Sequence, residues 1–98
     1  MIAYPIVVTK KANADEFAIY NYILTEFGKI YAEKFRSQLL QFFKTLSRYP
    51  FIGRATKNNP TLRVYVLNKH NKLVYKVTED KIVIVRLLHQ KMKIAGRY

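Results

Sequence analysis

The chain contains no cysteine and little negative charge, with three glycines, three prolines and six acidic residues among 98. The absence of cysteine excludes a disulfide framework, a thiolate metal site and a thiol nucleophile, and it fits the reducing cytoplasm. No apolar run approaches the roughly 20 residues of a membrane span. The first residues, MIAYPIVVTKK, are apolar before they are basic, which is the reverse of a secretory signal. We therefore expect a soluble, cytoplasmic protein without a membrane partner.

Metal ligands are also scarce. The only histidines are His70 and His89, which lie far apart in the sequence. Two imidazoles without a thiolate are too few for a zinc site. We therefore predict neither a metal nor another cofactor.

Positive charge is what the sequence has in excess. Eighteen lysines and arginines against six carboxylates give a formal charge of +12. Self-repulsion at such a charge destabilises the folded state, so an anionic partner is the favoured explanation over solubility alone. Nucleic acid is the commonest such partner, because cationic side chains release the counterions condensed on phosphates. An acidic protein would satisfy the same charge.

The length and the hydrophobic content indicate one domain that spans residues 1–98. The pattern from Ile2 to Thr9 predicts a short strand, which Pro5 assigns to a sheet edge or a bulge. Three later strands are predicted at Leu62 to Leu67, Leu73 to Thr78 and Lys81 to His89. The loop before them, FIGRATKNNPT, holds cations and no carboxylate.

Two helices are predicted between the first strand and this loop. Asn13, with Glu16 three residues later, has the pattern of a capping box for a helix that ends at Gly28. A second helix starts near Lys29 and stops at Tyr49-Pro50, so the pair forms an antiparallel hairpin. The spacing predicts these buried positions: Phe17, Tyr20, Leu24 and Phe27 in the first helix, and Tyr31, Phe35, Leu39, Phe42 and Leu46 in the second.

The connections NKHN and ED have the length of hairpin loops. A turn at His70-Asn71 gives one face to the helices and leaves the other open. The helix side then holds Val64, Val66, Leu73, Tyr75 and Val77, whereas the open face holds Arg63, Tyr65, Lys76 and Thr78. Tyr65 would be available to stack on a base, and Tyr75 would be core.

The side of the last strand from which Arg86 projects depends on the turn before it. A two-residue Glu79-Asp80 turn points Arg86 toward the core and puts His89 on the face of Lys76, whereas one extra loop residue moves Arg86 to the open face. Both faces of this strand are apolar, so it is predicted to lie inside the sheet. The tail QKMKIAGRY is basic and ends at Tyr98.

With this order of elements the chain resembles the RelE/ParE superfamily, the toxins of type II toxin-antitoxin systems. The resemblance is carried by VVTKKANADEFAIYNYI at residues 7–23, IGR at 52–54, LR at 62–63, HNKLVYKV at 70–77 and IVRLLHQ at 84–90. It implies an α+β fold in which an antiparallel helical hairpin packs on one face of a mainly antiparallel sheet of about four strands. It also implies an acidic antitoxin as partner, whose amphipathic segment folds onto the toxin.

The superfamily has two branches with different targets. RelE-like members cut messenger RNA on the ribosome without a metal, and ParE-like members inhibit DNA gyrase. The motifs around Arg54, Arg63 and Arg86 look closer to ParE. The LVYKV strand is similar to the YoeB-like nucleases, but their glutamate base has no counterpart, because no carboxylate lies between Gly53 and Lys72. We therefore expect gyrase inhibition, with mRNA cleavage or a non-toxic RNA-binding domain as alternatives.

The predicted contacts with the target are basic or aromatic: Arg54, Lys57, Arg63, Tyr65, Lys76, Arg86 and Tyr98. In a nuclease, Arg63, Arg86 and His89 would be catalytic, because RNA cleavage needs proton transfer and cations that stabilise the phosphorane. Tyr98 could replace His89 in proton transfer.

Each of these residues has a structural alternative. Arg86 could form an ion pair with Glu79, Asp80 or a helix carboxylate; we instead predict a functional arginine without a dedicated acidic partner. His89 could cap or pack a strand end, and Arg54 and Lys57 could belong to an ordinary basic loop. His70 is predicted to be solvated in its turn.

Overall fold

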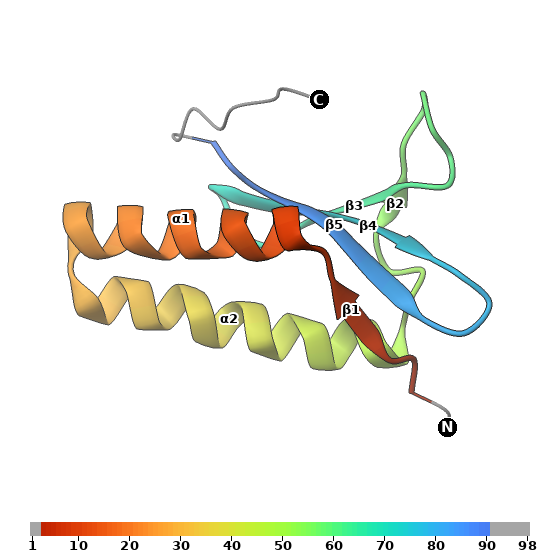
Figure 1. The fold of residues 1–98 in the computed structure, drawn as a ribbon, viewed down its shortest axis with the longest axis horizontal. Coiled ribbons are helices and arrows are strands. Elements are labelled where there is room, and N and C mark those ends of the chain that lie inside the picture. The colour runs from red at the N-terminus through yellow and green to blue at the C-terminus, as the bar shows by residue number, and fades with distance from the viewer. Residues whose placement is uncertain (1–2, 91–98) are drawn as a thin grey trace.

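The structure is a computed structural model, and it describes residues 3–90. Within these residues, two helices and five strands follow one another (Figure 1). Their bounds are β1 Ile6–Val8, α1 Lys10–Phe27, α2 Lys29–Arg48, β2 Arg54–Ala55, β3 Arg63–Val66, β4 Asn71–Val77 and β5 Ile82–His89. Neither helix in this part of the chain is long and apolar enough to cross a membrane.

The five strands form one sheet in the order β1-β5-β4-β3-β2. β1 runs parallel to β5, and the other neighbours are antiparallel. The helices lie antiparallel to each other and pack on one face of the sheet (Figure 1). This confirms the predicted α+β fold, except that the sheet has five strands and is mixed. β1 and β5 are far apart in the sequence, so no local sequence pattern predicts their parallel pairing.

The core lies between the helical hairpin and the sheet. Phe42 of α2 stacks on Tyr65 of β3 at 4.0 Å between ring centroids, and Tyr75 is fully buried, as predicted. Each large side chain buried here stabilises the fold by roughly 1.5–3 kcal/mol. The largest fully buried side chains are Tyr75, Ile19, Leu39, Leu46, Leu73, Ile82, Ile84 and Leu87.

α1 begins one turn earlier than the Asn13 pattern predicts. Thr9 is the N-cap, and its Oγ1 accepts a hydrogen bond from the Ala12 N–H at 3.1 Å. The same hydroxyl donates to the Val85 carbonyl of β5 at 3.0 Å. Asn13 lies inside the helix, so its assignment as the cap was wrong. Thr9 is favoured as the cap because its hydroxyl forms hydrogen bonds with both the first turn of α1 and the edge of β5.

The face that α1 turns to the sheet also differs from the prediction. Phe17 is 72% exposed and Phe27 is 58% exposed, whereas Ile19 and Ile23 are buried. Tyr31 of α2 is likewise exposed, and the other four predicted α2 positions are buried. α1 carries two apolar stripes, and contacts with β5 select the one that includes Ala12, Ile19 and Ile23, beside which Asp15 is also buried.

The β3–β4 hairpin is in a different register from the predicted one. Asn68 Oδ1 accepts hydrogen bonds from the N–H groups of His70 and Asn71 at 2.8 and 3.0 Å, which closes a loop at Asn68–His70. The observed pairs are Arg63 with Tyr75, Val64 with Val74, Tyr65 with Leu73 and Val66 with Lys72. Arg63 and Tyr65 therefore lie on the helix side, and the prediction that they share the open face was wrong.

β5 carries a bulge. The two-residue Glu79-Asp80 turn is present, closed by a 2.8 Å hydrogen bond from Thr78 N to Lys81 O. Beyond it the register shifts, because Tyr75 pairs with Ile84 but Val74 pairs with Arg86. The extra residue, Val85, lies within the strand, and it places Leu87 and His89 on the helix side.

Candidate functional site

The open face of the sheet has a concave region of about 740 Å³. Arg54, Lys57 and Lys72 line it with exposed cationic side chains, and its apolar part comes from Val64, Val74 and Leu88. The described residues that line it include no carboxylate, histidine or aromatic side chain. Such a surface can bind an anionic group by charge, but its described residues include no group that exchanges a proton near neutral pH.

The loop between β2 and β3 forms one wall of this concavity and extends away from the sheet (Figure 1). Its ends are joined by a 3.0 Å hydrogen bond from Thr56 N to Leu62 O. Asn59 stabilises the tip, since its Oδ1 accepts from the Thr61 hydroxyl at 2.6 Å. Lys57 is therefore presented by a loop with internal hydrogen bonds.

Lys72 and Lys76 alternate with inward-facing residues of β4, so both project from the open face. Lys76 was predicted from the sequence, and Lys72 was not. The signal that could have identified Lys72 is its position two residues before Val74 and four before Lys76, which puts all three on one face of a strand.

Arg63 projects toward the segment that precedes β2. Its Nη1 donates to the carbonyls of Gly53 at 2.5 Å and Phe51 at 3.2 Å, and its guanidinium lies 4.9 Å from the centroid of the Phe51 ring. From the adjacent strand, the Tyr75 hydroxyl accepts a hydrogen bond from Gly53 N at 2.7 Å. Burial raises the pKa of the Tyr75 phenol, and the Gly53 hydrogen bond and the Arg63 charge oppose that rise.

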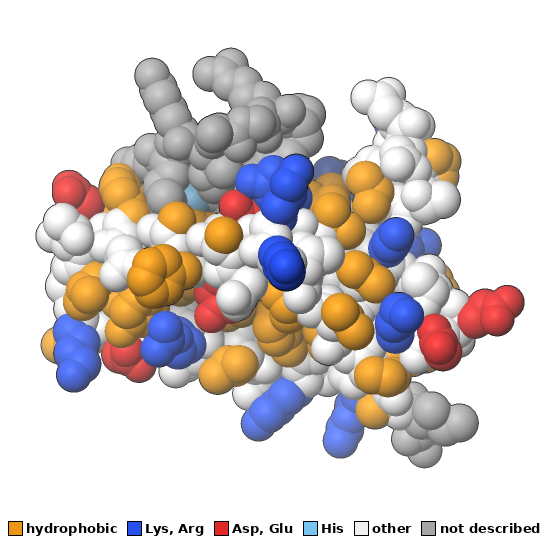
Figure 2. Space-filling model, viewed as in Figure 1, with side chains coloured by type: hydrophobic (Ala, Val, Ile, Leu, Met, Phe, Trp, Pro, Cys, Tyr) orange, Lys and Arg blue, Asp and Glu red, His pale blue; other side chains and the backbone are white. Residues whose placement is uncertain are grey.

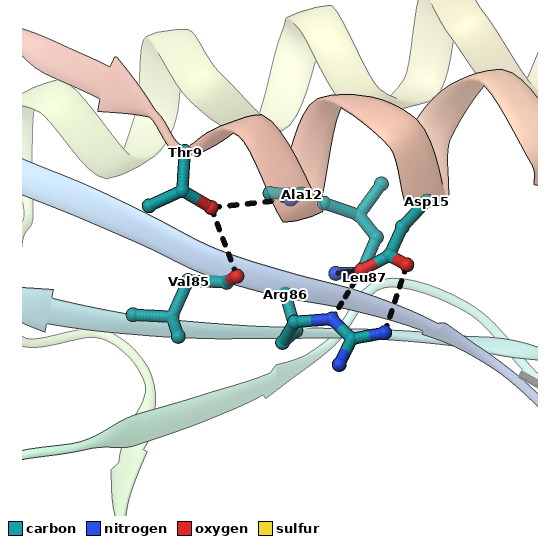
Figure 3. Close-up of polar contacts among 6 residues, drawn as sticks. All are labelled: Thr9, Ala12, Asp15, Val85, Arg86 and Leu87. Carbon is teal, nitrogen blue, oxygen red and sulfur yellow. Dashed lines mark hydrogen bonds and ion pairs between the residues drawn. The ribbon is translucent and has the colours of Figure 1, made fainter. Parts of the chain in front are cut away.

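Arg86 forms an ion pair with Asp15 of α1. Arg86 Nε donates to Oδ2 at 2.7 Å and Nη2 donates to Oδ1 at 2.9 Å, in a bidentate geometry (Figure 3). The Leu87 N–H donates to the same Oδ2 at 3.0 Å. The side chains are 14% and 7% exposed, respectively. Arg86 therefore has a dedicated acidic partner, and the prediction that it lacks one was wrong.

His89 is buried on the helix side, and its ring contacts Tyr22 at 5.2 Å and His70 at 5.8 Å between centroids. Both histidines line a groove of about 420 Å³ whose walls include Phe27 and Tyr31. His70 is half-buried rather than solvated as predicted, because it packs against His89.

The structure therefore separates the predicted site residues into two groups. Arg54, Lys57 and Lys76 lie on the open face, together with Lys72. The others project toward the helix side or pair with α1: Arg63, Tyr65, Arg86 and His89. Tyr98 lies outside the described residues.

A helical hairpin on one face of a mixed sheet, with a cationic opposite face, has the fold of the RelE/ParE toxins. The chromosomal ParDE toxin-antitoxin system of P. aeruginosa superposes with a TM-score of 0.76 at 24% identity, over 89% of this chain and 96% of that one. The RelBE2 toxin-antitoxin complex of Mycobacterium tuberculosis has a TM-score of 0.66 at 19% identity, over 90% and 99%. The YoeB dimer of Staphylococcus aureus has a TM-score of 0.62 at 20% identity, over 89% and 97%.

These identities show a shared fold, and the family follows from the sequence match. Residues 6–94 match the family model of the ParE toxin of the type II toxin-antitoxin system parDE, and the chain belongs to that family. The predicted RelE/ParE resemblance is thereby confirmed. No curated protein matches the sequence.

Proposed function

We propose that this toxin arrests growth by inhibiting DNA gyrase, and that it does so through the cationic concavity of the open face. The observation that carries the proposal is the chemistry of that concavity. It offers Arg54, Lys57 and Lys72 for an anionic surface, and its described lining offers no proton acceptor or donor that works near neutral pH. Cleavage of RNA requires both kinds of group. The ParE family match supports the same choice.

Two of the described residues that a nuclease mechanism would use, His89 and Arg86, are engaged elsewhere. His89 is buried against Tyr22, and the guanidinium of Arg86 is held by Asp15. Tyr65 stacks on Phe42 and is directed away from the open face. These placements argue against ribosome-dependent mRNA cleavage, and the lack of an aromatic side chain among the described residues of the concavity argues against a base-stacking RNA-binding domain.

We further propose an acidic antitoxin as the partner, in keeping with the toxin-antitoxin complexes among the structural relatives. Apolar side chains are exposed on the edge strand β1 and on the helical hairpin of α1 and α2. Figure 2 shows them interspersed with cations over the two helices. The most exposed are Ile30, Phe17, Tyr31, Phe51 and Phe27. An acidic amphipathic segment would cover apolar and cationic groups together. A neighbouring gene that encodes a small protein with an acidic C-terminal half is expected.

The test is to induce the toxin without an antitoxin and to measure plasmid supercoiling, the DNA damage response and messenger 5′ ends on ribosomes. We expect loss of negative supercoiling and a DNA damage response. The double variant Arg54→Ala/Lys57→Ala should abolish both effects, because it removes two cations of the concavity. The matched control, Lys29→Ala/Lys44→Ala, removes the same charge from α2 and should retain them. Codon-phased messenger cuts with normal supercoiling would refute gyrase inhibition and support mRNA cleavage.

A further inference from the structure

The segment that leads into the cationic loop is held from the core side of the sheet. Tyr75 of β4 is fully buried, and its hydroxyl reaches Gly53 N at 2.7 Å. Gly53 is followed directly by Arg54, the first residue of β2. A buried backbone N–H needs a hydrogen-bond partner, and here a side-chain hydroxyl from a strand two positions away in the sheet supplies it.

The approach is so close that only glycine fits at position 53. A Cβ built there would lie 2.6 Å from Tyr75 Oη and 2.8 Å from Cε1. Contacts below 3.0 Å require the ring or the backbone to move, and the ring is enclosed by the core. The glycine therefore permits the contact between a core residue and the base of the loop.

The Gly53 carbonyl is held as well. Arg63 Nη1 donates to it at 2.5 Å and to the Phe51 carbonyl at 3.2 Å, while the guanidinium covers the Phe51 ring. Both polar atoms of Gly53 are thus bound by side chains from the sheet. β2 itself has only two residues, paired to β3 as Arg54 with Val64 and Ala55 with Arg63. So short a strand has little stability of its own.

We propose that Tyr75 and Arg63 are positioning residues, which hold the Gly53 peptide so that Arg54 contacts the target from the open face. The proposal rests on the proposed function only in taking the open face as the surface that contacts the target. Arg63 is then a positioning residue, and not the catalytic or anion-binding residue predicted from the sequence. Arg63 affects the contact with the target by holding Arg54 in position.

The test is a double-mutant cycle on growth arrest, expressed per folded toxin molecule. Tyr75→Phe keeps the buried ring and removes the acceptor for Gly53 N. Loss of one hydrogen bond corresponds to about a fivefold loss of potency. In the Arg54→Ala background, the same substitution should change nothing further, because the residue that it positions is absent. A tyrosine that only stabilises the fold would leave the potency per folded molecule unchanged in both backgrounds, and one that acts independently of Arg54 would reduce it by the same factor in both.

Arg63→Lys provides a second, independent cycle. Lysine keeps the charge but cannot bridge two carbonyls and cover a ring with one planar group. We expect a loss in the wild-type background and none beside Arg54→Ala. The matched control is Tyr65→Phe, which removes a hydroxyl from the helix side of β3 and should retain full potency. Circular dichroism and thermal unfolding give the folded fraction of each variant.

Three results would overturn the proposal: full potency of Tyr75→Phe, equal losses in both backgrounds, or full potency of Arg54→Ala, which would leave the two residues nothing to position. Growth arrest does not depend on which target is inhibited. A toxin that arrests growth with normal supercoiling would therefore refute gyrase inhibition and leave the cycle interpretable.

Discussion

At the scale of single residues, Asp15 links the first helix to the last strand. Its carboxylate accepts from Arg86 twice and from the Leu87 N–H once, and its side chain is 7% exposed. A buried charge is tolerated only when it is paired and hydrogen-bonded, and Asp15 meets both conditions. Arg86 can therefore stand in an apolar strand, because its charge is neutralised from α1 rather than from its own hairpin.

Breaking this pair is expected to destabilise the protein. Arg86→Ala leaves Asp15 as an unpaired, buried carboxylate and should lower the free energy of unfolding by about 3 kcal/mol. Urea unfolding followed by circular dichroism measures the change, and toxicity per folded molecule should be preserved. Glu26→Ala, which removes an exposed carboxylate from the same helix, is the control and should have little effect. A fully stable but non-toxic Arg86→Ala protein would instead support a functional arginine.

At the scale of elements, β1 pairs with only the first part of β5, and α1 with its N-cap supplies hydrogen-bond partners to the rest of that strand edge. β1 pairs with β5 as far as Val8 and Ile84, after which Thr9 N donates to Ile84 O at 3.1 Å. The Thr9 hydroxyl then reaches Val85 O, and Asp15 reaches the Leu87 N–H (Figure 3). The Thr9 hydroxyl and the Asp15 carboxylate thus bind backbone groups of β5 that would otherwise be open to pairing with a strand of another chain.

Thr9 and Asn13 provide a direct comparison of the observed cap with the predicted one. Thr9→Ala removes the cap of Ala12 N and the donor to Val85 O, and should cost about 1–2 kcal/mol of unfolding free energy. Asn13→Ala should cost less than about 0.5 kcal/mol, because the residue is exposed within the helix. Chemical denaturation of both variants tests this. A larger loss for Asn13→Ala would show that the helix starts where the sequence pattern puts it.

At the scale of the whole molecule, a charge of +12 coexists with exposed apolar side chains. Two copies of so basic a chain repel each other, so the apolar surface suits an acidic partner better than a second copy. Cations occur over the helices (Figure 2), and others line the concavity of the open face. The concavity differs from the rest because it gathers cations in a hollow without a carboxylate in its described lining.

This difference should appear in the salt dependence of polyanion binding. For duplex DNA as the probe, each phosphate contact contributes a slope of about −0.9 in a plot of log K against log salt concentration. Arg54→Ala/Lys57→Ala should make the slope less steep by about 2, because two contacts are lost. Lys29→Ala/Lys44→Ala should change it less. Fluorescence anisotropy at several salt concentrations measures the slopes, and equal changes for the two variants would mean that the concavity binds no better than the general surface.

Local patterns in the sequence determined the order of the two helices and of four of the five strands, the α+β class and the family, whereas the two-residue β2 lies in a segment predicted as loop. They also determined most buried positions of α2, the burial of Tyr75 and the Glu79-Asp80 turn, because helix periodicity and turn residues act over a few positions. Basic residues in a loop without carboxylates were likewise identifiable as exposed cations.

Only the tertiary structure decided which side chains share a face. The Asn68 loop and the Val85 bulge each change the pairing register by an odd number of positions, and such a change carries the side chains of the affected strand segment to the opposite face. This is why Arg63, Tyr65 and His89 lie on the helix side, whereas the alternation of β4 alone places Lys72 on the open face. The choice between the two apolar stripes of α1, and the pairing of Asp15 with Arg86, depend on residues that are distant in sequence, which local periodicity does not encode.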